Sequence, residues 1–396
     1  MSAELQPFYA DLHIHIGRTE KGRPVKISAS KDLTFFNIAR EASERKGIDI
    51  IGVIDCQSPS VQEEIGMYLE RGDMTELAGG GIRFRRTTVL LGSELEIKEP
   101  GRGPAHLLCF MPTLGAMKEF TGWLKGRMKN AELSSQRVYV SARELQTETV
   151  GRGGFMIPAH IFTPHKSLYG SCCSRMEEVL DPDGIAAVEL GLSSNTDMAD
   201  RIPELKRHTF VTNSDAHSLA KIGREYNVLQ LAEPSFEEVV KAFLRRDGRK
   251  VAANYGLEPQ LGKYHRTYCA ACETLLDRPE TVSVCPRCGG NQIVRGVFDR
   301  IASLSASAAS SGTAAAPDHR PPYYHQIPLE FIPGLGLKKR EALLNTFGTE
   351  MNIMHRVDQA SLARVAGAAP ASMIVSARSG QVAVQAGGGG KYGKVT

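Results

Sequence analysis

FYADLHIH, residues 8–15, joins an apolar run with strand character to two histidines that are two positions apart. Side chains two apart in a strand project to the same side, so His13 and His15 can face one point. The arrangement recurs where IDIIGVI is followed by Asp55 and FMIPA by His160. An apolar strand that ends in a potential metal ligand is therefore the repeated unit of the N-terminal part of the chain.

Short apolar runs alternate with amphipathic stretches up to about residue 257, which is typical of repeated β-α units. Helical patterns are expected between the strands, for example at 32–45, 115–128 and 236–245. Seven or eight such units predict an α/β fold with a closed β/α barrel, although an open doubly wound sheet would give a similar pattern. The expected strands are 8–13, 48–54, 89–95, 106–111, 154–159, 185–190, 209–213 and 250–253.

Potential metal ligands stand at the ends of most of these strands. The C-terminal ends of barrel strands converge on one face, so residues far apart in the sequence can share one site. Mixed imidazole and carboxylate ligation suits Zn, Mn or Fe, and a bridging carboxylate such as Glu94 could hold two ions that promote phosphoester hydrolysis. One such residue alone would more simply be a core histidine or a surface carboxylate. The whole set predicts a multinuclear site: Asp11, His13, His15, Asp55, Glu94, His106, His160, Glu189, Asp215 and His217.

The segments ADLHIH, GVID, GSELEI, HLLCF, PAH and NSDAH, in that order, resemble the polymerase and histidinol phosphatase (PHP) family of metal-dependent phosphoesterases. The resemblance covers roughly residues 8–230 and implies a distorted barrel with two or three divalent ions, Zn, Mn or Mg. It implies one ligand group of His13, His15, Glu94 and Asp215, and another of Glu94, His106 and His160. Arg18 to Lys21 and Cys56 stand where trinuclear members usually have histidines. A third ion, with His217, Asp55 and His165 as candidate ligands, therefore stays open.

Four of the eight cysteines are regularly spaced, as Cys269-x2-Cys272 and Cys285-x2-Cys288 with twelve residues between the pairs. Each Cys-x2-Cys turn presents two thiolates to one tetrahedral ion, so we expect a closed, structural zinc site. The alternatives, two disulfides or a redox pair, are uncommon in a cytosolic chain. The remaining cysteines are expected to be small buried hydrophobic residues: Cys56, Cys109, Cys172 and Cys173.

IPGLGLKKREALLNTFGTE, residues 332–350, resembles a helix-hairpin-helix. Its glycines permit a tight turn, and the next helix begins with free backbone amides that, with adjacent basic side chains, can hold a DNA phosphate without reading bases. The expected contact residues are Gly334, Gly336, Lys338, Lys339 and Arg340. An ordinary helical pair with a solvated basic face is the alternative. Residues 362–380 are a candidate second, degenerate hairpin.

Charge and composition divide the chain into modules. From Pro259 onward there are 15 Lys/Arg and 9 Asp/Glu, so this part carries +6 and the preceding part −2, as expected for contact with a phosphate backbone. We predict a PHP barrel over 1–257, a four-cysteine module over 258–300, a flexible linker or loop over 301–325, and a helix-hairpin-helix region with a glycine-rich tail over 326–396. The sequence shows neither a secretory start nor a long apolar run, so we expect a cytoplasmic, nucleoid-associated protein without membrane contact.

This order of modules, with the ending AGGGGKYGKV, resembles the endonuclease Q family over the entire chain. The resemblance implies a DNA repair endonuclease that hydrolyses the phosphodiester 5′ to deaminated bases (uracil, hypoxanthine, xanthine) or abasic sites in double-stranded DNA. Asp215, Glu94 and His217 would lie at the catalytic centre, and a replication clamp is a candidate partner. The alternatives are another PHP phosphoesterase, such as a small-molecule phosphatase or a proofreading exonuclease, and a non-catalytic DNA-binding adaptor.

A damaged base has to leave the stack before a protein can inspect it. We therefore expect a lesion pocket between the barrel and the cysteine module. Residues near the expected strand ends are its candidates: Asn213, Phe162 and Tyr169.

Overall fold

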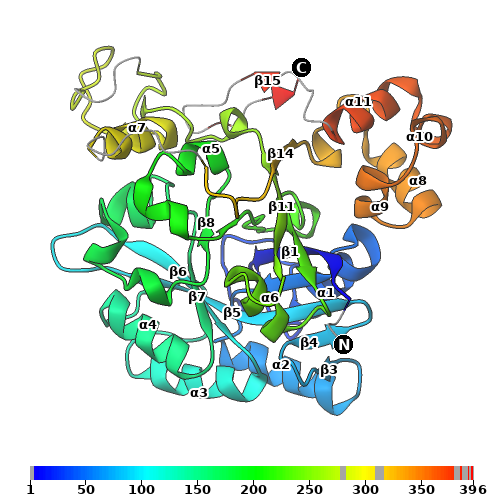
Figure 1. Ribbon diagram of the computed structural model, residues 1–396, viewed down its shortest axis with the longest axis horizontal. Helices are drawn as coiled ribbons and strands as arrows, with labels where there is room; N and C mark the ends of the chain where they lie inside the picture. The colour runs from blue at the N-terminus through cyan, green and yellow to red at the C-terminus, as the bar shows by residue number, and fades with distance from the viewer. Residues whose placement is uncertain are drawn as a thin grey trace.

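The computed structural model describes residues 4–276, 282–307, 316–378, 384–385, 391 and 394–395. Its described residues form three parts: a large α/β domain, a small cysteine-rich module beside helix α7, and a compact helical region (Figure 1). The middle of the expected linker, 308–315, and most of the glycine-rich tail lie outside the described residues. In the described part of the chain, no helix is both long and apolar enough to cross a bilayer.

A mixed sheet is the framework of the large domain, with the strand order β14-β11-β10-β1-β2-β5-β4-β3, and with β6 beside β5 and β7 beside β6. A short parallel pair, β8 and β9, stands between β7 and β11: Ala186 N donates to Met156 O, and the Asn254 amide donates to Phe210 O. These contacts close the ring into a distorted barrel rather than an open sheet. The strands are β1 Gln6–Ile14, β2 Ile50–Val53, β3 Thr75–Glu76, β4 Ile82–Phe84, β5 Thr87–Ile97, β6 Ala105–Met111, β7 Phe155–Pro158, β8 Val188–Glu189, β9 Phe210–Val211, β10 Tyr226–Leu231, β11 Lys250–Leu257 and β14 Tyr323–Gln326.

The strand directions differ from repeated β-α units. Strands β1, β2 and β5 are parallel, as expected, but β5–β6, β6–β7, β1–β10 and β10–β11 are antiparallel. A connection of seven residues between β5 and β6 (98–104) is too short for the crossover helix that a parallel pair needs. Because β6 runs backwards, its first residues lie beside the last residues of β5, and His106 is opposite Glu96.

Helices cover the barrel from outside, and several of them begin at a side-chain cap. Thr113 and Ser141 accept hydrogen bonds from the first-turn amides of α3 and α4. Apolar residues of these helices, such as Met117 and Phe120, are buried against the sheet, and each contributes about 1.5–3 kcal/mol. The helices are α1 Phe35–Arg40, its π-helical continuation η1 Glu41–Lys46, α2 Pro59–Glu70, α3 Leu114–Lys125, α4 Ala142–Gly151, α5 Thr196–Ala199 and α6 Phe236–Phe243, with short turns η2 Leu168–Cys172, η3 Met176–Glu178, η4 Pro182–Gly184, η5 Pro203–Arg207, η6 Leu219–Lys221 and η7 Pro259–Leu261.

The C-terminal elements form the two smaller parts. The cysteine module has β12 Tyr268–Cys269 paired with β13 Ile293–Val294, followed by α7 Val297–Ser307. Residues 301–307, which were expected to belong to the linker, therefore complete a helix. The helical region has its own apolar core and comprises η9 Leu329–Phe331, α8 Leu337–Phe347, α9 Glu350–His355, α10 Gln359–Ala366 and α11 Ala368–Arg378, and a short pair β15 Val384–Gln385 and β16 Lys394–Val395 follows it.

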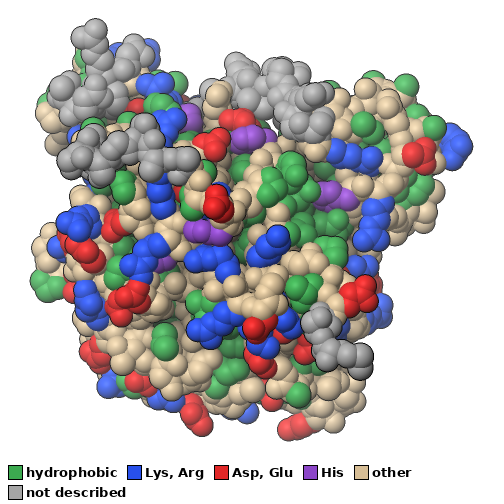
Figure 2. Space-filling view, in the orientation of Figure 1, with side chains coloured by type: hydrophobic (Ala, Val, Ile, Leu, Met, Phe, Trp, Pro, Cys, Tyr) green, Lys and Arg blue, Asp and Glu red, His purple; other side chains and the backbone are tan. Residues whose placement is uncertain are grey.

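The helical region is docked on the barrel rather than held only by its connection. Lys46 Nζ lies 2.6 Å from Glu350 Oε2, and Arg45 Nη2 lies 2.6 Å from Glu341 Oε1. His355 stacks on Tyr9 of β1, with 5.2 Å between ring centroids, and its Nε2 is hydrogen-bonded to the hydroxyl of Tyr226 of β10. These contacts join the helical region to the barrel, and the two parts form one continuous surface in the space-filling view (Figure 2).

Candidate metal centre

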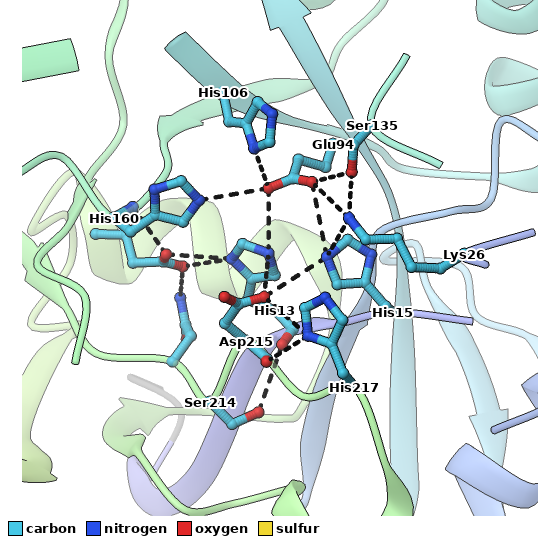
Figure 3. A network of polar contacts seen from close by, with 12 residues as sticks. His13, His15, Lys26, Glu94, His106, Ser135, His160, Ser214, Asp215 and His217 are labelled. Atoms are coloured by element: carbon cyan, nitrogen blue, oxygen red, sulfur yellow. Dashed lines mark hydrogen bonds and ion pairs between the residues drawn. The ribbon is translucent and has the colours of Figure 1, made fainter. Parts of the chain in front are cut away.

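Seven imidazole and carboxylate side chains converge at one mouth of the barrel (Figure 3). They form three overlapping groups, and within each group one ligand atom per residue lies within 4.8 Å of the others. Glu94 belongs to two groups, and so does His15. The groups are His13, His15 and Glu94; His15, Asp215 and His217; and Glu94, His106 and His160.

The sheet explains how the first of these residues meet. His13 lies in β1 and His15 directly follows it, so both imidazoles project to the same side, as expected from their spacing. Glu94 lies in β5, two strands away in the parallel part of the sheet. His106 is the second residue of the antiparallel β6 next to it, and its Nδ1 is 2.7 Å from Glu94 Oε1. The reversal of β6 is thus what makes a residue at a strand start face residues at strand ends.

Asp215 and His160 reach the centre from strained backbone. Both have positive φ, 46° and 31°, in the left-handed region that non-glycine residues rarely adopt. Asp215 and His217 lie beyond the end of β9 at Val211, in a loop rather than in a strand. Backbone hydrogen bonds between Ala216 and β1 hold the Asp215 loop instead: Ala216 N donates to His13 O, and His15 N donates to Ala216 O. Such strain typically accompanies a functional constraint.

A second layer of carboxylates fixes the two histidines of β1. Asp55 Oδ2 lies 3.1 Å from His15 Nδ1, and Glu189 Oε2 lies 3.0 Å from His13 Nδ1. Each contact leaves Nε2 facing the centre, which is the usual arrangement behind metal-bound imidazoles. Asp55 therefore supports a candidate ligand and lies outside the three groups. Asp11 also lies outside them, because its oxygens accept the amides of Ser214 and Gly223.

The electrostatics of the centre favour a bound cation. Burial would lower the pKa of His13, but Glu189 and Asp215 outweigh burial and raise that pKa well above its usual value. Burial would raise the pKa of Glu94, yet His106 and Lys26 hold it well below the usual range. His13 Nε2 and His106 Nε2 are buried and lack a hydrogen-bond partner among the described residues. His13 Nε2 lies 3.6 Å from Glu94 Oε1 and 3.4 Å from Asp215 Oδ1, and an imidazole nitrogen held among carboxylates in this way fits divalent metal binding.

A cavity of about 470 Å³ opens over these residues. Asn213 lines it, while its amide also binds Leu12 N and Glu189. The prediction that Phe162 and Tyr169 line a pocket is wrong, because the two rings stack in the buried core, where Tyr169 donates to Glu204. The aromatic ring at the cavity is instead that of Tyr264.

The cavity wall carries excess positive charge and includes His165. His165 lies outside the three groups and packs edge-on against Tyr264, with 5.6 Å between ring centroids. Burial lowers the pKa of His165, and Lys263 lowers it further. The cationic wall residues are Lys26, Lys166, Lys221, Arg224 and Lys263.

Lys26 and Ser135 are two residues of the centre that we did not predict. Lys26 Nζ donates to Ser135 Oγ at 2.6 Å and lies 3.5 Å from Glu94 Oε2, and Ser135 also donates to Glu94 (Figure 3). Both side chains come from loops without hydrophobic periodicity, so no pattern indicated them. They place a fixed ammonium group beside the shared carboxylate.

Comparisons with known proteins agree with this geometry. The profile of a family described as PHP-associated matches residues 194–247. The chain is 51% identical to the uncharacterized protein YqxK of Bacillus subtilis (strain 168) over 393 residues, 99% of this chain and 100% of that protein. It is 35% identical to the uncharacterized protein MJ0043 of Methanocaldococcus jannaschii over 305 residues, 69% of this chain and 37% of that protein.

Two solved structures decide the family. One is the lesion-specific endonuclease PfuEndoQ from Pyrococcus furiosus, with a TM-score of 0.84, 32% identity and coverage of 98% of this chain and 95% of that one. The other is an endonuclease Q in complex with a 27-mer duplex substrate that has an abasic lesion at the active site, with a TM-score of 0.84, 31% identity and coverage of 98% and 96%. The chain belongs to the endonuclease Q family. It is accordingly an endonuclease on a PHP-like barrel.

The four cysteines of this endonuclease Q chain also converge. Cys269 Sγ lies 3.6 Å from Cys288 Sγ, and Cys272 Sγ lies 3.6 Å from Cys285 Sγ. Two sulfurs bound to one tetrahedral zinc at about 2.3 Å are about 3.7–3.8 Å apart, whereas a disulfide requires about 2.05 Å. The set therefore fits one structural ion. The other four cysteines are buried free thiols, as expected.

Two glycine turns of the helical region lie side by side. Gly334 has φ +75°, and Gly336 caps α8, whose next residues Lys338 and Lys339 are exposed. A Cβ atom added to Gly367, in the turn before α11, would lie 3.9 Å from Lys339 Nζ. A Cβ atom on Gly334 would lie 3.8 Å from Pro370 in the first turn of α11, so the amino ends of α8 and α11 lie close together. The candidate second hairpin corresponds to α10 and α11, which are joined at Gly367.

Proposed function

We propose that this protein nicks double-stranded DNA on the 5′ side of deaminated bases (uracil, hypoxanthine or xanthine) and of abasic sites, with divalent metals at the barrel mouth. The convergence of the three ligand groups on one cation-rimmed cavity carries this proposal. The match to a structure that holds a lesion-containing duplex at its active site supports DNA as the substrate.

The centre offers ligands for two or three ions of Zn, Mn or Mg. Glu94 would be shared by two ions, with His13 and His15 on one side and His106 and His160 on the other, and Asp215 and His217 complete the set around His15. Bound ions would supply Lewis-acid activation of water and of the scissile phosphate. The cysteine set would hold one further, structural zinc.

The chain's own side chains contribute positioning and charge. Asp55 and Glu189 fix the histidine rings, so the ligand atoms stay in place while DNA enters and leaves. The ammonium group of Lys26 lies beside the centre and can neutralise a non-bridging phosphate oxygen as negative charge develops on it. Lys221 and Arg224 on the cavity wall would attract the flanking phosphates.

The cavity suits a nucleotide that has left the helix. Its volume of about 470 Å³ lies within the range of about 300–1,000 Å³ that encloses small molecules. Asn213 offers an amide at the cavity wall, and Tyr264 offers an aromatic ring there. The amino ends of α8 and α11, with Lys338 and Lys339, would hold the DNA backbone without reading its bases.

A panel of end-labelled duplexes, each with one lesion, tests the proposal. We expect a single nick on the 5′ side of uracil, hypoxanthine, xanthine or an abasic site with Mg²⁺ or Mn²⁺, and no cut of the undamaged duplex. Release of inorganic phosphate or of successive mononucleotides would instead favour another PHP phosphoesterase. Lesion binding without any cut under all metal conditions would favour a DNA-binding adaptor.

A further inference from the structure

An isoleucine stands at the tip of a tight turn next to the metal centre. Ala29 N donates to Lys26 O at 3.0 Å, so Ile27 and Ser28 are the central residues of a β-turn. Such positions usually carry glycine, proline, asparagine, aspartate or serine. Ile27 is 81% exposed, and its neighbours Lys26 and Ser28 both line the cavity over the centre. A bulky apolar side chain therefore projects into solvent at the cavity rim.

The turn is tied to the same segments that carry the candidate ligands. Lys26 N donates to Ile16 O directly after His15, and Ser30 N donates to His217 O. A Cβ atom on Gly17 would come within 2.0 Å of Ser30 O, so only glycine allows this close packing. The position of the Ile27 tip relative to the metal centre is thus fixed by backbone contacts.

The surroundings of Ile27 are cationic. The segment 18–31 contains five basic residues and a single acidic one, Glu20. Three of these basic side chains are exposed, namely Lys21, Arg23 and Lys31. An apolar patch for a protein partner would extend over several hundred Å², whereas here one apolar side chain stands among cations. That combination matches nucleic acid, in which an apolar base stack lies between rows of phosphates.

We propose that Ile27 is a wedge that enters the base stack beside a lesion and fills the space left when the damaged nucleotide turns into the cavity. The proposal rests on the proposed lesion nicking. Proteins that distort DNA insert single apolar side chains, isoleucine among them, between base steps in this way, and an enzyme that extrudes a nucleotide must offset the lost stacking. The lysines and arginine around the tip would hold the phosphates on either side. Ile27 would act on extrusion of the nucleotide and leave hydrolysis itself to the metal centre.

Replacement of the tip tests the wedge. We expect Ile27→Ala to slow single-turnover nicking of a uracil-containing duplex by about tenfold or more, because stacking lost on extrusion is no longer replaced. Nicking of uracil in a single strand, which needs no extrusion from a duplex, should change by less than about twofold. Ile27→Met keeps an apolar wedge and should retain most of the duplex activity. Val150→Ala, a 47% exposed valine on α4, is the matched control for loss of an exposed apolar side chain.

A second measurement separates extrusion from cutting. 2-Aminopurine placed next to uracil brightens when it loses its stacking partner, so its fluorescence should rise with the wild-type protein and Ile27→Met and stay low with Ile27→Ala. Unchanged duplex nicking by Ile27→Ala, or an equal loss on duplex and single strand, would overturn the wedge. A wild-type protein that cuts no lesion duplex would instead overturn the proposed function, which this design shows separately.

Discussion

The barrel centre and the cysteine module both gather metal-binding side chains, but they do so in opposite ways. The barrel centre collects residues from His13 to His217, and the fold itself positions them on strands and strained loops. The cysteine module collects Cys269 to Cys288 from one short segment whose only described strands, β12 and β13, are two residues long each. Cys288 is exposed, whereas His13 and Glu94 are buried. We therefore expect the barrel to form its site without metal and the cysteine module to depend on metal for its structure.

This difference predicts which property changes when a ligand is removed from each site. In the barrel, two apolar clusters on the two faces of the strands hold the ligands in place, so removing one ligand should impair chemistry and spare the fold. In the module, few apolar side chains are buried beside the cysteines, among them Tyr268 and Leu276. Structural zinc contributes about 10–16 kcal/mol to the folding of small modules, so removing one thiolate there should unfold the module.

The largest expected effect is on the barrel centre. Asp215→Asn keeps the size of the side chain but removes the negative charge that faces His13 and His15. We expect nicking of a uracil duplex to fall by about a thousandfold or more, with DNA affinity and melting temperature nearly unchanged. Asp197→Asn, an exposed aspartate on α5, is the control. Full nicking activity in Asp215→Asn would remove this residue from the centre.

In the cysteine module, loss of a ligand should impair folding of the module rather than catalysis. Cys285→Ser removes one of four thiolates, and we expect the purified protein to lose one equivalent of zinc and to become sensitive to proteases between about residues 265 and 300. The barrel transition in calorimetry should persist. Ser283→Ala, two residues away, controls for local substitution. If Cys285→Ser kept its zinc and its protease resistance, the module would not depend on the metal.

Sequence patterns and observed structure agree best where apolar runs are continuous. Strands β2, β6 and β7 were predicted because each is an uninterrupted buried run, and β1 and β5 were predicted because each contains a long buried stretch. Strand β10 was not, because Asn227 interrupts its apolar pattern. That buried amide bonds to Thr212 and Ala10, so it costs little in the fold but cannot be distinguished from a loop residue in the sequence.

Residues of the two sites could likewise be predicted only where they follow a sequence pattern. Cysteine spacing is local, so the four-thiolate set could be predicted directly. The barrel set could be predicted because strand ends converge. Side chains on loops could not: Lys26 and Ser135 follow no period, and Phe162 and Tyr169 were placed at a pocket because strand ends are near, although both rings turn into the core. Direction of a loop side chain depends on tertiary packing, which a single sequence does not display.

A smaller effect is expected at the predicted helix-hairpin-helix, residues 332–350, which contributes no residue to the metal groups found among the described residues. Lys338 and Lys339 are exposed at the start of α8, and their replacement by Ala should weaken DNA binding by about tenfold for every sequence. The salt dependence of binding should become shallower by about one to two counterions. The matched control is the double replacement of Lys118 and Lys125 on α3. Loss of binding with an unaltered salt slope would argue against a phosphate contact.

The smallest expected effect concerns Glu225, a buried carboxylate that belongs to none of the metal groups found among the described residues. Burial raises the pKa of Glu225 to about 8, although Leu257 N donates to it, whereas Glu94 in the metal centre stays ionised. A carboxyl whose folded pKa exceeds its unfolded pKa stabilises the fold at low pH, and this contribution is lost as pH rises from about 4.5 through 8. Glu225→Gln cannot ionise and so does not lose this stability at high pH. Its melting temperature should therefore match that of wild type at pH 5 and exceed it by a few degrees at pH 9. Glu237 is exposed on α6, and Glu237→Gln should leave the dependence of melting temperature on pH unchanged. If the melting temperatures of wild type and Glu225→Gln instead changed in parallel with pH, Glu225 would ionise in the folded barrel without loss of stability.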